Sequence, residues 1–148
     1  MGAMFVRSLI PALLFVLLAA SRTTASLAQT PAAPAGSPIT FTEEQAGQGA
    51  EVFSRACLSC HPRKDMSNID FRVKWNGRTA FDFLELVRST MPQDSPGSLA
   101  REDYVGLTAY VAKLNGVAPG SVVLPEDEAS LKKLILTFPA LLFDQRHH

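Results

Sequence analysis

Two cysteines and a histidine lie close together in the segment Cys57-Leu58-Ser59-Cys60-His61. In an exported chain this C-x-x-C-H order is the attachment signature of c-type haem. Each thiol can add across one haem vinyl group, and two intervening residues let both sulfurs reach neighbouring vinyls. The histidine that follows is then held where an imidazole nitrogen can bind the iron. The motif predicts one covalent haem c, attached through Cys57 and Cys60, with His61 as the proximal iron ligand.

Zinc binding, thiol redox chemistry and a local disulfide also use closely spaced cysteines. A zinc site normally shows a second ligand pair at finger-like spacing, but the chain has no further cysteine and its other histidines are His147 and His148. A thioredoxin-like pair needs a βαβ context, and the sequence shows no strand alternation. A disulfide across two residues would close only a tiny loop. Haem attachment is the preferred interpretation, and these three are its alternatives.

The second axial ligand has two methionine candidates outside the N-terminal leader. Met66 follows His61 by five residues and would have to wrap around the edge of the ring. Met91 ends an apolar helix and precedes Pro92, which fixes the next turn, so its thioether can face the opposite side of the ring. We predict Met91 as the distal iron ligand, with core packing as the alternative. A neutral sulfur ligand favours ferrous iron and raises the reduction potential.

The segment between the two expected ligands contains the one tryptophan of the chain, Trp75, and a mixed run of charges. The indole N–H of Trp75 could donate to a haem propionate, with packing alone as the alternative. Residues 63–88 hold six basic and four acidic side chains. They predict either a mildly positive rim that docks a redox partner or an ordinary solvated surface.

The N-terminus has the features of a secretory signal peptide over residues 1–28. Arg7 precedes the apolar run Leu9–Ala20, which has the length of a signal and is too short to span a bilayer. The signal predicts a periplasmic protein, and an uncleaved anchor that leaves the protein on the membrane is the alternative. Residues 29–40 are rich in Pro, Ala, Gly and Ser and predict a flexible linker.

Two helices are expected to position the cysteine motif and Met91. Thr42 and Gln45 predict a capping box at the start of a helix over 43–57, in which apolar residues recur at helical spacing. Thr79 is the expected N-cap of a second helix over 80–90. Apolar residues cover more than half of the circumference of this helix, and it ends before a proline.

The rest of the chain carries weaker signals. A third helix is expected over 99–115, with Ser98 as its cap and Gly116 as the left-handed residue that ends it. Residues 58–78 show no sustained periodicity and predict a loop. The tail is expected to contain a short fourth helix within residues 126–136.

These features resemble the class I cytochrome c family. The matching residues are Gly49, Phe53, Cys57, Cys60, His61, Met91 and Tyr110. The resemblance implies an all-α protein, a small cytochrome c fold of three to four helices around one covalently bound haem, over residues 41–118. Residues 119–148 would then form a C-terminal extension with a short helix. It also implies that the first and last helices cross, with Gly49 and Phe53 against Leu107 and Tyr110.

A narrower resemblance, over residues 43–125, is to the cytochrome c domains of quinohaemoprotein alcohol dehydrogenases and their free-standing relatives. The 148 residues do not include the large propeller domain that carries the quinone in those enzymes. The residues that carry the resemblance are Thr90-Met91-Pro92-Gln93, Pro96-Gly97-Ser98-Leu99, Tyr104, Ala109-Tyr110, Asn115-Gly116, Pro119-Gly120-Ser121 and Leu124-Pro125.

With both axial positions filled, the iron has no open position for substrate, so the predicted function is single-electron transfer rather than catalysis. We expect a periplasmic monohaem c-type cytochrome that carries electrons between a dehydrogenase and a terminal acceptor. Its expected partners are redox proteins, with a quinoprotein dehydrogenase and an oxidase as candidates. The 14 basic and 14 acidic side chains balance, which argues against nucleic acid as a partner.

Two other functions remain as alternatives. One is a fixed cytochrome subunit of a quinoprotein dehydrogenase or oxidase complex. The many apolar residues of the tail suggest it, because they could bind a partner protein. The other is a haem sensor or a peroxidase-like protein with an open iron site, which requires that Met91 does not bind.

Overall fold

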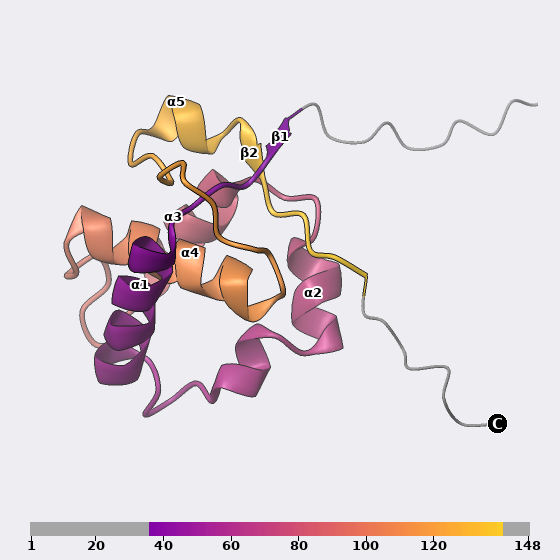
Figure 1. The fold of residues 1–148 in the computed structure, drawn as a ribbon. Helices are drawn as coiled ribbons and strands as arrows, with labels where there is room; N and C mark the ends of the chain where they lie inside the picture. The colour runs from indigo at the N-terminus through magenta and orange to yellow at the C-terminus, as the bar shows by residue number, and fades with distance from the viewer. Residues whose placement is uncertain (1–35, 141–148) are drawn as a thin grey trace, which may run out of the picture. The chain divides into compact units, whose positions relative to one another are not determined.

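The structure, a computed structural model, describes residues 36–140. The predicted signal peptide, most of the predicted linker and residues 141–148 lie outside the described residues. The fold is all-α, as predicted, and no helix within residues 36–140 is long and apolar enough to cross a membrane. The elements in chain order are β1 (Ser37–Pro38), α1 (Glu43–Ala56), the 3-10 turn η1 (Arg63–Met66), α2 (Ile69–Trp75), α3 (Ala80–Thr90), α4 (Arg101–Leu114), α5 (Glu128–Leu131) and β2 (Leu134–Ile135) (Figure 1).

Helix α1 begins with the predicted capping box. The hydroxyl of Thr42 accepts a hydrogen bond from the Gln45 N–H, and the Gln45 side chain accepts one from the Thr42 N–H, both at 3.2 Å. The same Gln45 amide also pairs with the backbone of Leu124, donating at 2.9 Å and accepting at 2.8 Å. The Gln45 side chain therefore caps the N-terminus of α1 and also connects α1 to the tail by hydrogen bonds.

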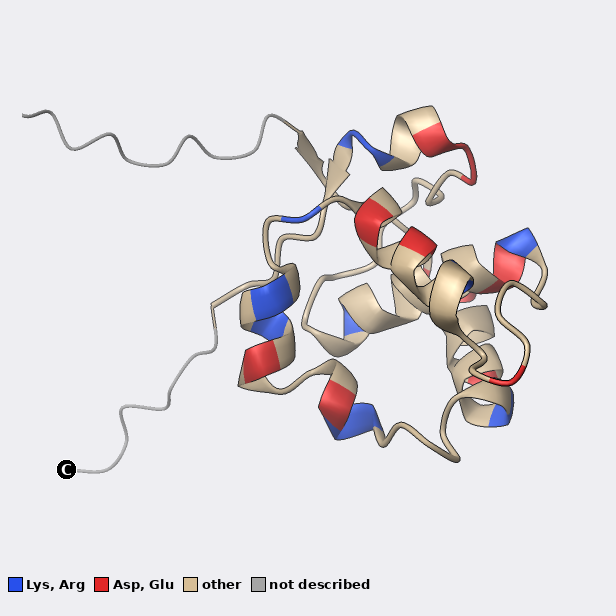
Figure 2. Ribbon diagram, turned by 180° about the vertical axis from the view of Figure 1, so that it is seen from behind, with Lys and Arg blue, Asp and Glu red and all other residues tan. Residues whose placement is uncertain are grey.

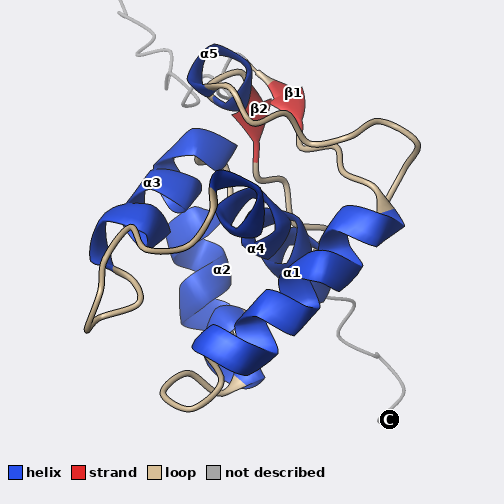
Figure 3. Ribbon diagram, turned by 90° about the vertical axis from the view of Figure 1, so that its left-hand side faces the viewer, coloured by secondary structure: helices blue, strands red, loops and turns tan. Residues whose placement is uncertain are grey.

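Helix α4 lies at the centre of the fold, and α1 crosses it (Figure 3). Nine consecutive residues of α4, Tyr104 to Ala112, are buried. A Cβ built on Gly49 would lie 1.9 Å from the carbonyl oxygen of Gly106, so the backbones touch at this point. Phe53 packs on Tyr110 with ring centroids 5.5 Å apart. The expected helix crossing is present, and its closest backbone partner is Gly106, which the sequence reasoning did not single out.

Helix α3 spans the predicted residues, and Thr79 caps it as expected, in a capping box with Asp82. Helix α4 starts later than predicted, because its N-cap is Ala100 and no side chain caps it. The expected cap, Ser98, instead donates its backbone N–H to Ser95 in the preceding turn. Gly116 does end α4, with a φ of +89°, a region that glycine enters without steric cost.

Residues 58–78, expected as loop, contain η1 and the seven-residue helix α2. Asn68 caps α2 by accepting a hydrogen bond from the Phe71 N–H at 2.8 Å. The sequence of α2 does not show the usual helical spacing of apolar residues, because its buried face includes a charged residue, Arg72, which is 8% exposed. Its guanidinium donates to the carbonyl oxygens of Asn115, at 2.7 Å, and of Pro139, so the buried charge has polar partners.

The boundaries predicted for the linker and the C-terminal extension differ from the structure. At the linker end, β1 pairs in parallel with β2, Ser37 with Leu134 and Pro38 with Ile135, and Ile39 is buried. The tail runs beside α2 (Figure 1), and the predicted fourth helix is only α5. Buried residues of the two segments are Ile39, Leu124, Leu131, Ile135, Leu136 and Phe138. Both segments therefore belong to the domain core, because apolar side chains in them are covered by the helices.

The buried tail predicts a large loss of stability when one of its core side chains is shortened. Leu136 is 0% exposed, so Leu136→Ala leaves a cavity and should lower the free energy of unfolding by about 2 kcal/mol. Val123 is 60% exposed in the same tail, and Val123→Ala should change it by less than about 0.5 kcal/mol. Chemical denaturation of both variants measures the difference. Equal small effects would show that the tail is not part of the core.

Candidate functional site

One cavity of about 840 Å³ lies between the end of α1, the η1–α2 segment, α3 and α4. This volume is in the range of small-molecule and cofactor sites. Its walls include all five residues predicted to bind haem or iron: Cys57, Cys60, His61, Trp75 and Met91. These residues are up to 34 positions apart in sequence, so the fold brings them together at one site.

The cysteine motif forms a tight turn at the end of α1. Cys57 is the C-cap residue, and its carbonyl oxygen accepts hydrogen bonds from the N–H groups of Cys60, at 3.1 Å, and His61, at 2.9 Å. Both cysteines are free thiols, with Cys57 half-buried and Cys60 exposed. Burial raises the pKa of the Cys57 thiol, and the nearby Arg55 opposes this weakly. The turn therefore presents two thiols and the imidazole at one edge of the cavity.

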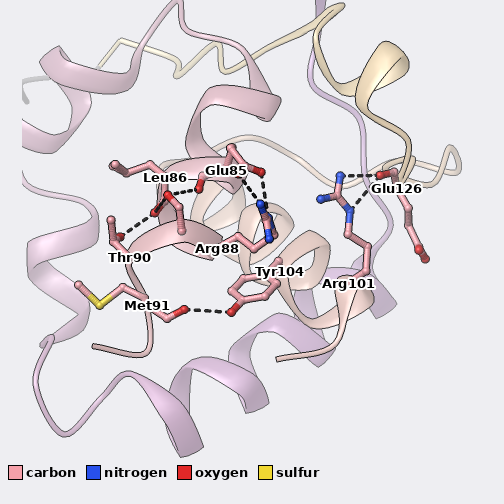
Figure 4. Close-up of polar contacts among 9 residues, drawn as sticks. Glu85, Leu86, Arg88, Thr90, Met91, Arg101, Tyr104 and Glu126 are labelled. Carbon is pink, nitrogen blue, oxygen red and sulfur yellow. Dashed lines mark hydrogen bonds and ion pairs between the residues drawn. The ribbon is translucent and has the colours of Figure 1, made fainter. Parts of the chain in front are cut away.

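Met91 lies on the cavity from another direction, at the C-cap of α3. Its N–H donates to Val87 at 2.8 Å, and its carbonyl oxygen accepts a hydrogen bond from the Tyr104 hydroxyl at 2.9 Å (Figure 4). These two bonds, and a longer one from the Gly97 N–H to the same carbonyl oxygen at 3.4 Å, hold its backbone. Met66 also lines the cavity, which leaves it as a second thioether within the same site.

Trp75 forms part of the cavity wall near the end of α2. It is 5% exposed and meets Phe83 edge to face, with centroids 5.0 Å apart. Two cations flank its ring, Lys74 with Nζ 5.3 Å from the centroid and Arg78 with Cζ at 5.6 Å. Lys74 itself lines the cavity. The sequence analysis counted Lys74 only among the basic residues of the predicted rim, although its place next to Trp75 was the available signal for the site.

The predicted positive rim does not form around this cavity. The charged residues that line it are Asp65, Asp70, Lys74 and Asp94. Two other basic residues of the segment are occupied elsewhere: Arg72 is buried, and Arg88 makes two hydrogen bonds to Glu85, at 2.6 and 2.9 Å. Figure 2 shows charges of both signs distributed over the helices. The alternative interpretation, a mixed solvated surface, fits the structure.

The residues around the cavity match the chemistry of a covalently held haem. Two free thiols lie four residues or fewer from an imidazole, a thioether enters from α3, and apolar side chains form the walls between them. The apolar wall residues are Phe53, Phe71, Phe83, Val87, Leu107 and Val111. Within residues 36–140 no three His, Cys, Asp or Glu side chains are grouped to hold a metal ion. The part of the chain that is described thus does not support the zinc alternative.

Residues 44–111 match the protein family described as cytochrome c oxidase, cbb3-type, subunit III. The matched segment begins in α1 and ends in α4, and it contains Cys57, Cys60, His61 and Met91. No curated protein and no solved structure matches the chain. The narrower similarity to quinohaemoprotein alcohol dehydrogenases stays a prediction. The family match, the all-α fold and the C-x-x-C-H turn on a large cavity together support a c-type cytochrome domain in this chain.

Proposed function

We propose that this protein is a monohaem electron carrier in which His61 and Met91 are the two axial iron ligands. The observation that supports the proposal best is that one cavity is lined by both thiols of the C-x-x-C-H turn, by His61 and by Met91. A c-type cytochrome domain is typical of electron transfer rather than catalysis. We infer export to the periplasm from the predicted signal peptide.

Each residue has a defined role in this proposal. Cys57 and Cys60 hold the haem through two thioethers, and the bound haem supplies one-electron iron chemistry. His61 and Met91 would be the two protein ligands of the iron and would leave no position open to a substrate. Phe53, Leu107 and the other apolar wall residues keep water from the buried part of the site. Trp75 and Lys74 line the same cavity and would offer an N–H and an ammonium group to the haem propionates.

The proposal is tested by the ligand chemistry of the purified exported protein. We expect reversible reduction by one electron and no change in the reduced spectrum under carbon monoxide at neutral pH, because both axial positions are filled. Ready binding of carbon monoxide would contradict the closed iron site and favour the sensor or peroxidase-like alternative.

Haem attachment should also decide whether the domain folds. The cavity walls are apolar and would face water without the haem, so the double variant Cys57→Ala, Cys60→Ala should lose most of its far-UV circular dichroism helix signal. Ser59→Ala lies between the two cysteines at an exposed position and should keep both haem and helices. A double variant with parental helix content would contradict this prediction.

A second candidate function is a fixed cytochrome subunit of an oxidoreductase complex, because the matching family is described by an oxidase subunit. The described part of the tail, up to residue 140, does not favour it, since Leu131, Leu136 and Phe138 are buried in the domain itself. Size-exclusion chromatography of the natively extracted protein separates the two functions. A monomer favours the free carrier, and co-elution with a haem-containing oxidase or dehydrogenase favours the subunit.

A further inference from the structure

Two tyrosines of α4 bind the two segments that hold the proposed axial ligands. The Tyr104 hydroxyl donates to the carbonyl oxygen of Met91 at 2.9 Å. The Tyr110 hydroxyl accepts from Nε of Arg63, two residues after His61, at 2.9 Å. The two tyrosines are six positions apart on the α-helix, a rise of about 9 Å. One rigid, buried helix therefore contacts the distal segment with one hydroxyl and the proximal segment with the other.

The Tyr104 hydroxyl closes the loop that follows Met91. Besides donating to Met91, it accepts a hydrogen bond from the Leu99 N–H at 3.4 Å. One hydroxyl thus joins the first and last residues of the segment 91–99. Tyr104 is 1% exposed, so no water can replace the hydroxyl without rearrangement of the core, and its loss leaves two backbone groups without this partner.

The bond acts directly on the backbone from which the Met91 side chain projects. Met91 ends α3, and beyond its N–H bond to Val87 the backbone is held by the Tyr104 hydroxyl and by a longer contact from the Gly97 N–H, 3.4 Å from the same carbonyl oxygen. The shorter of these two contacts comes from Tyr104. The position of Met91 is therefore set by α4 as well as by α3 (Figure 4).

We propose that Tyr104 is a positioning residue for the distal ligand, whose buried hydroxyl holds Met91 where its sulfur binds the iron. The inference rests on the proposed function, in which Met91 is that ligand. Tyr110 provides the matched control, because it lies on the same helix and bonds the proximal segment with its own hydroxyl. Removing either hydroxyl keeps the aromatic ring and its packing.

The test compares Tyr104→Phe, Tyr110→Phe and the parent as haem-loaded proteins, with imidazole as the competing ligand. Displacement of Met91 is followed by loss of the weak far-red ferric band that iron–sulfur coordination gives. We expect Tyr104→Phe to retain the band and the helix content but to lose the band at about tenfold lower imidazole concentration, equivalent to about 1.4 kcal/mol. Tyr110→Phe should stay within about twofold of the parent.

Equal imidazole affinity in Tyr104→Phe and the parent would overturn this inference and leave Met91 ligation intact. Equal weakening in both tyrosine variants would also overturn it, because the effect would then be general loosening of α4. A parent protein without the far-red band would instead overturn the proposed function itself, and this inference with it.

A second measurement covers the case in which Tyr104→Phe does not fold. In the parent holoprotein, saturation with imidazole should accelerate amide hydrogen exchange at Leu99, whose N–H is bonded to the Tyr104 hydroxyl. Exchange at Asn115, at the other end of α4, should not change. Unchanged exchange at Leu99 would contradict the coupling between the hydroxyl and the distal ligand.

Discussion

Replacement of Met91 by alanine should abolish the far-red ferric band, open the reduced iron to carbon monoxide and lower the reduction potential by on the order of 100 mV. The reason is that hydrogen bonds to its backbone hold Met91 at the cavity wall, and a neutral sulfur ligand favours the ferrous state. Absorption spectra and a redox titration of the variant measure these changes. Haem attachment should persist, because both thiols are untouched.

Met66→Leu is the matched control, because Met66 is the other thioether on the same cavity. It should keep the band, the resistance to carbon monoxide and a potential close to that of the parent. If Met66→Leu loses the band while Met91→Ala keeps it, the two ligand assignments must be exchanged. If neither variant changes the spectrum, no methionine in this cavity binds the iron.

The Gly49→Ala variant should be destabilised by about 3 kcal/mol or more, an effect at the upper end for overpacking. A Cβ at this position would lie 1.9 Å from the carbonyl oxygen of Gly106 and 2.8 Å from Cβ of Tyr110. The first of these atoms is backbone at the centre of the fold, so α1 and α4 would have to separate. Chemical denaturation of the haem-loaded protein measures the loss.

Gly47→Ala in the same helix is the control for this effect. A Cβ at Gly47 meets nothing within 4 Å, and alanine has the higher helix propensity, so this variant should be more stable than the parent by about 0.5–1 kcal/mol. If both variants lose stability, the loss comes from replacing a glycine within α1 and not from the contact between α1 and α4. Full stability of Gly49→Ala would contradict the close crossing of α1 and α4.

Sequence patterns predicted the parts of this structure that depend on local chemistry. The capping residues Thr42 and Thr79 are short-range signals, because each bonds to an N–H three residues away. The C-x-x-C-H turn is equally local. Met91 was singled out because a helix end before a proline is also visible in sequence, and the structure places it on the same cavity as the motif.

Features that depend on distant partners were missed or placed wrongly. The helix α2 was not predicted because Arg72 turns inward to carbonyl oxygens of residues 115 and 139, which no local period reveals. The tail was taken as an extension because its apolar residues are covered only by the folded helices. The hydrogen bond from the Tyr104 hydroxyl to Met91 spans 13 positions and requires the fold.

The covalent haem is the central claim, and the mass of the exported protein under denaturing conditions tests it most directly. We predict a polypeptide that carries the mass of one haem, which remains on the proteolytic fragment containing Cys57 and Cys60. A protein of unmodified mass, recovered from cells that mature other c-type cytochromes, would contradict the account.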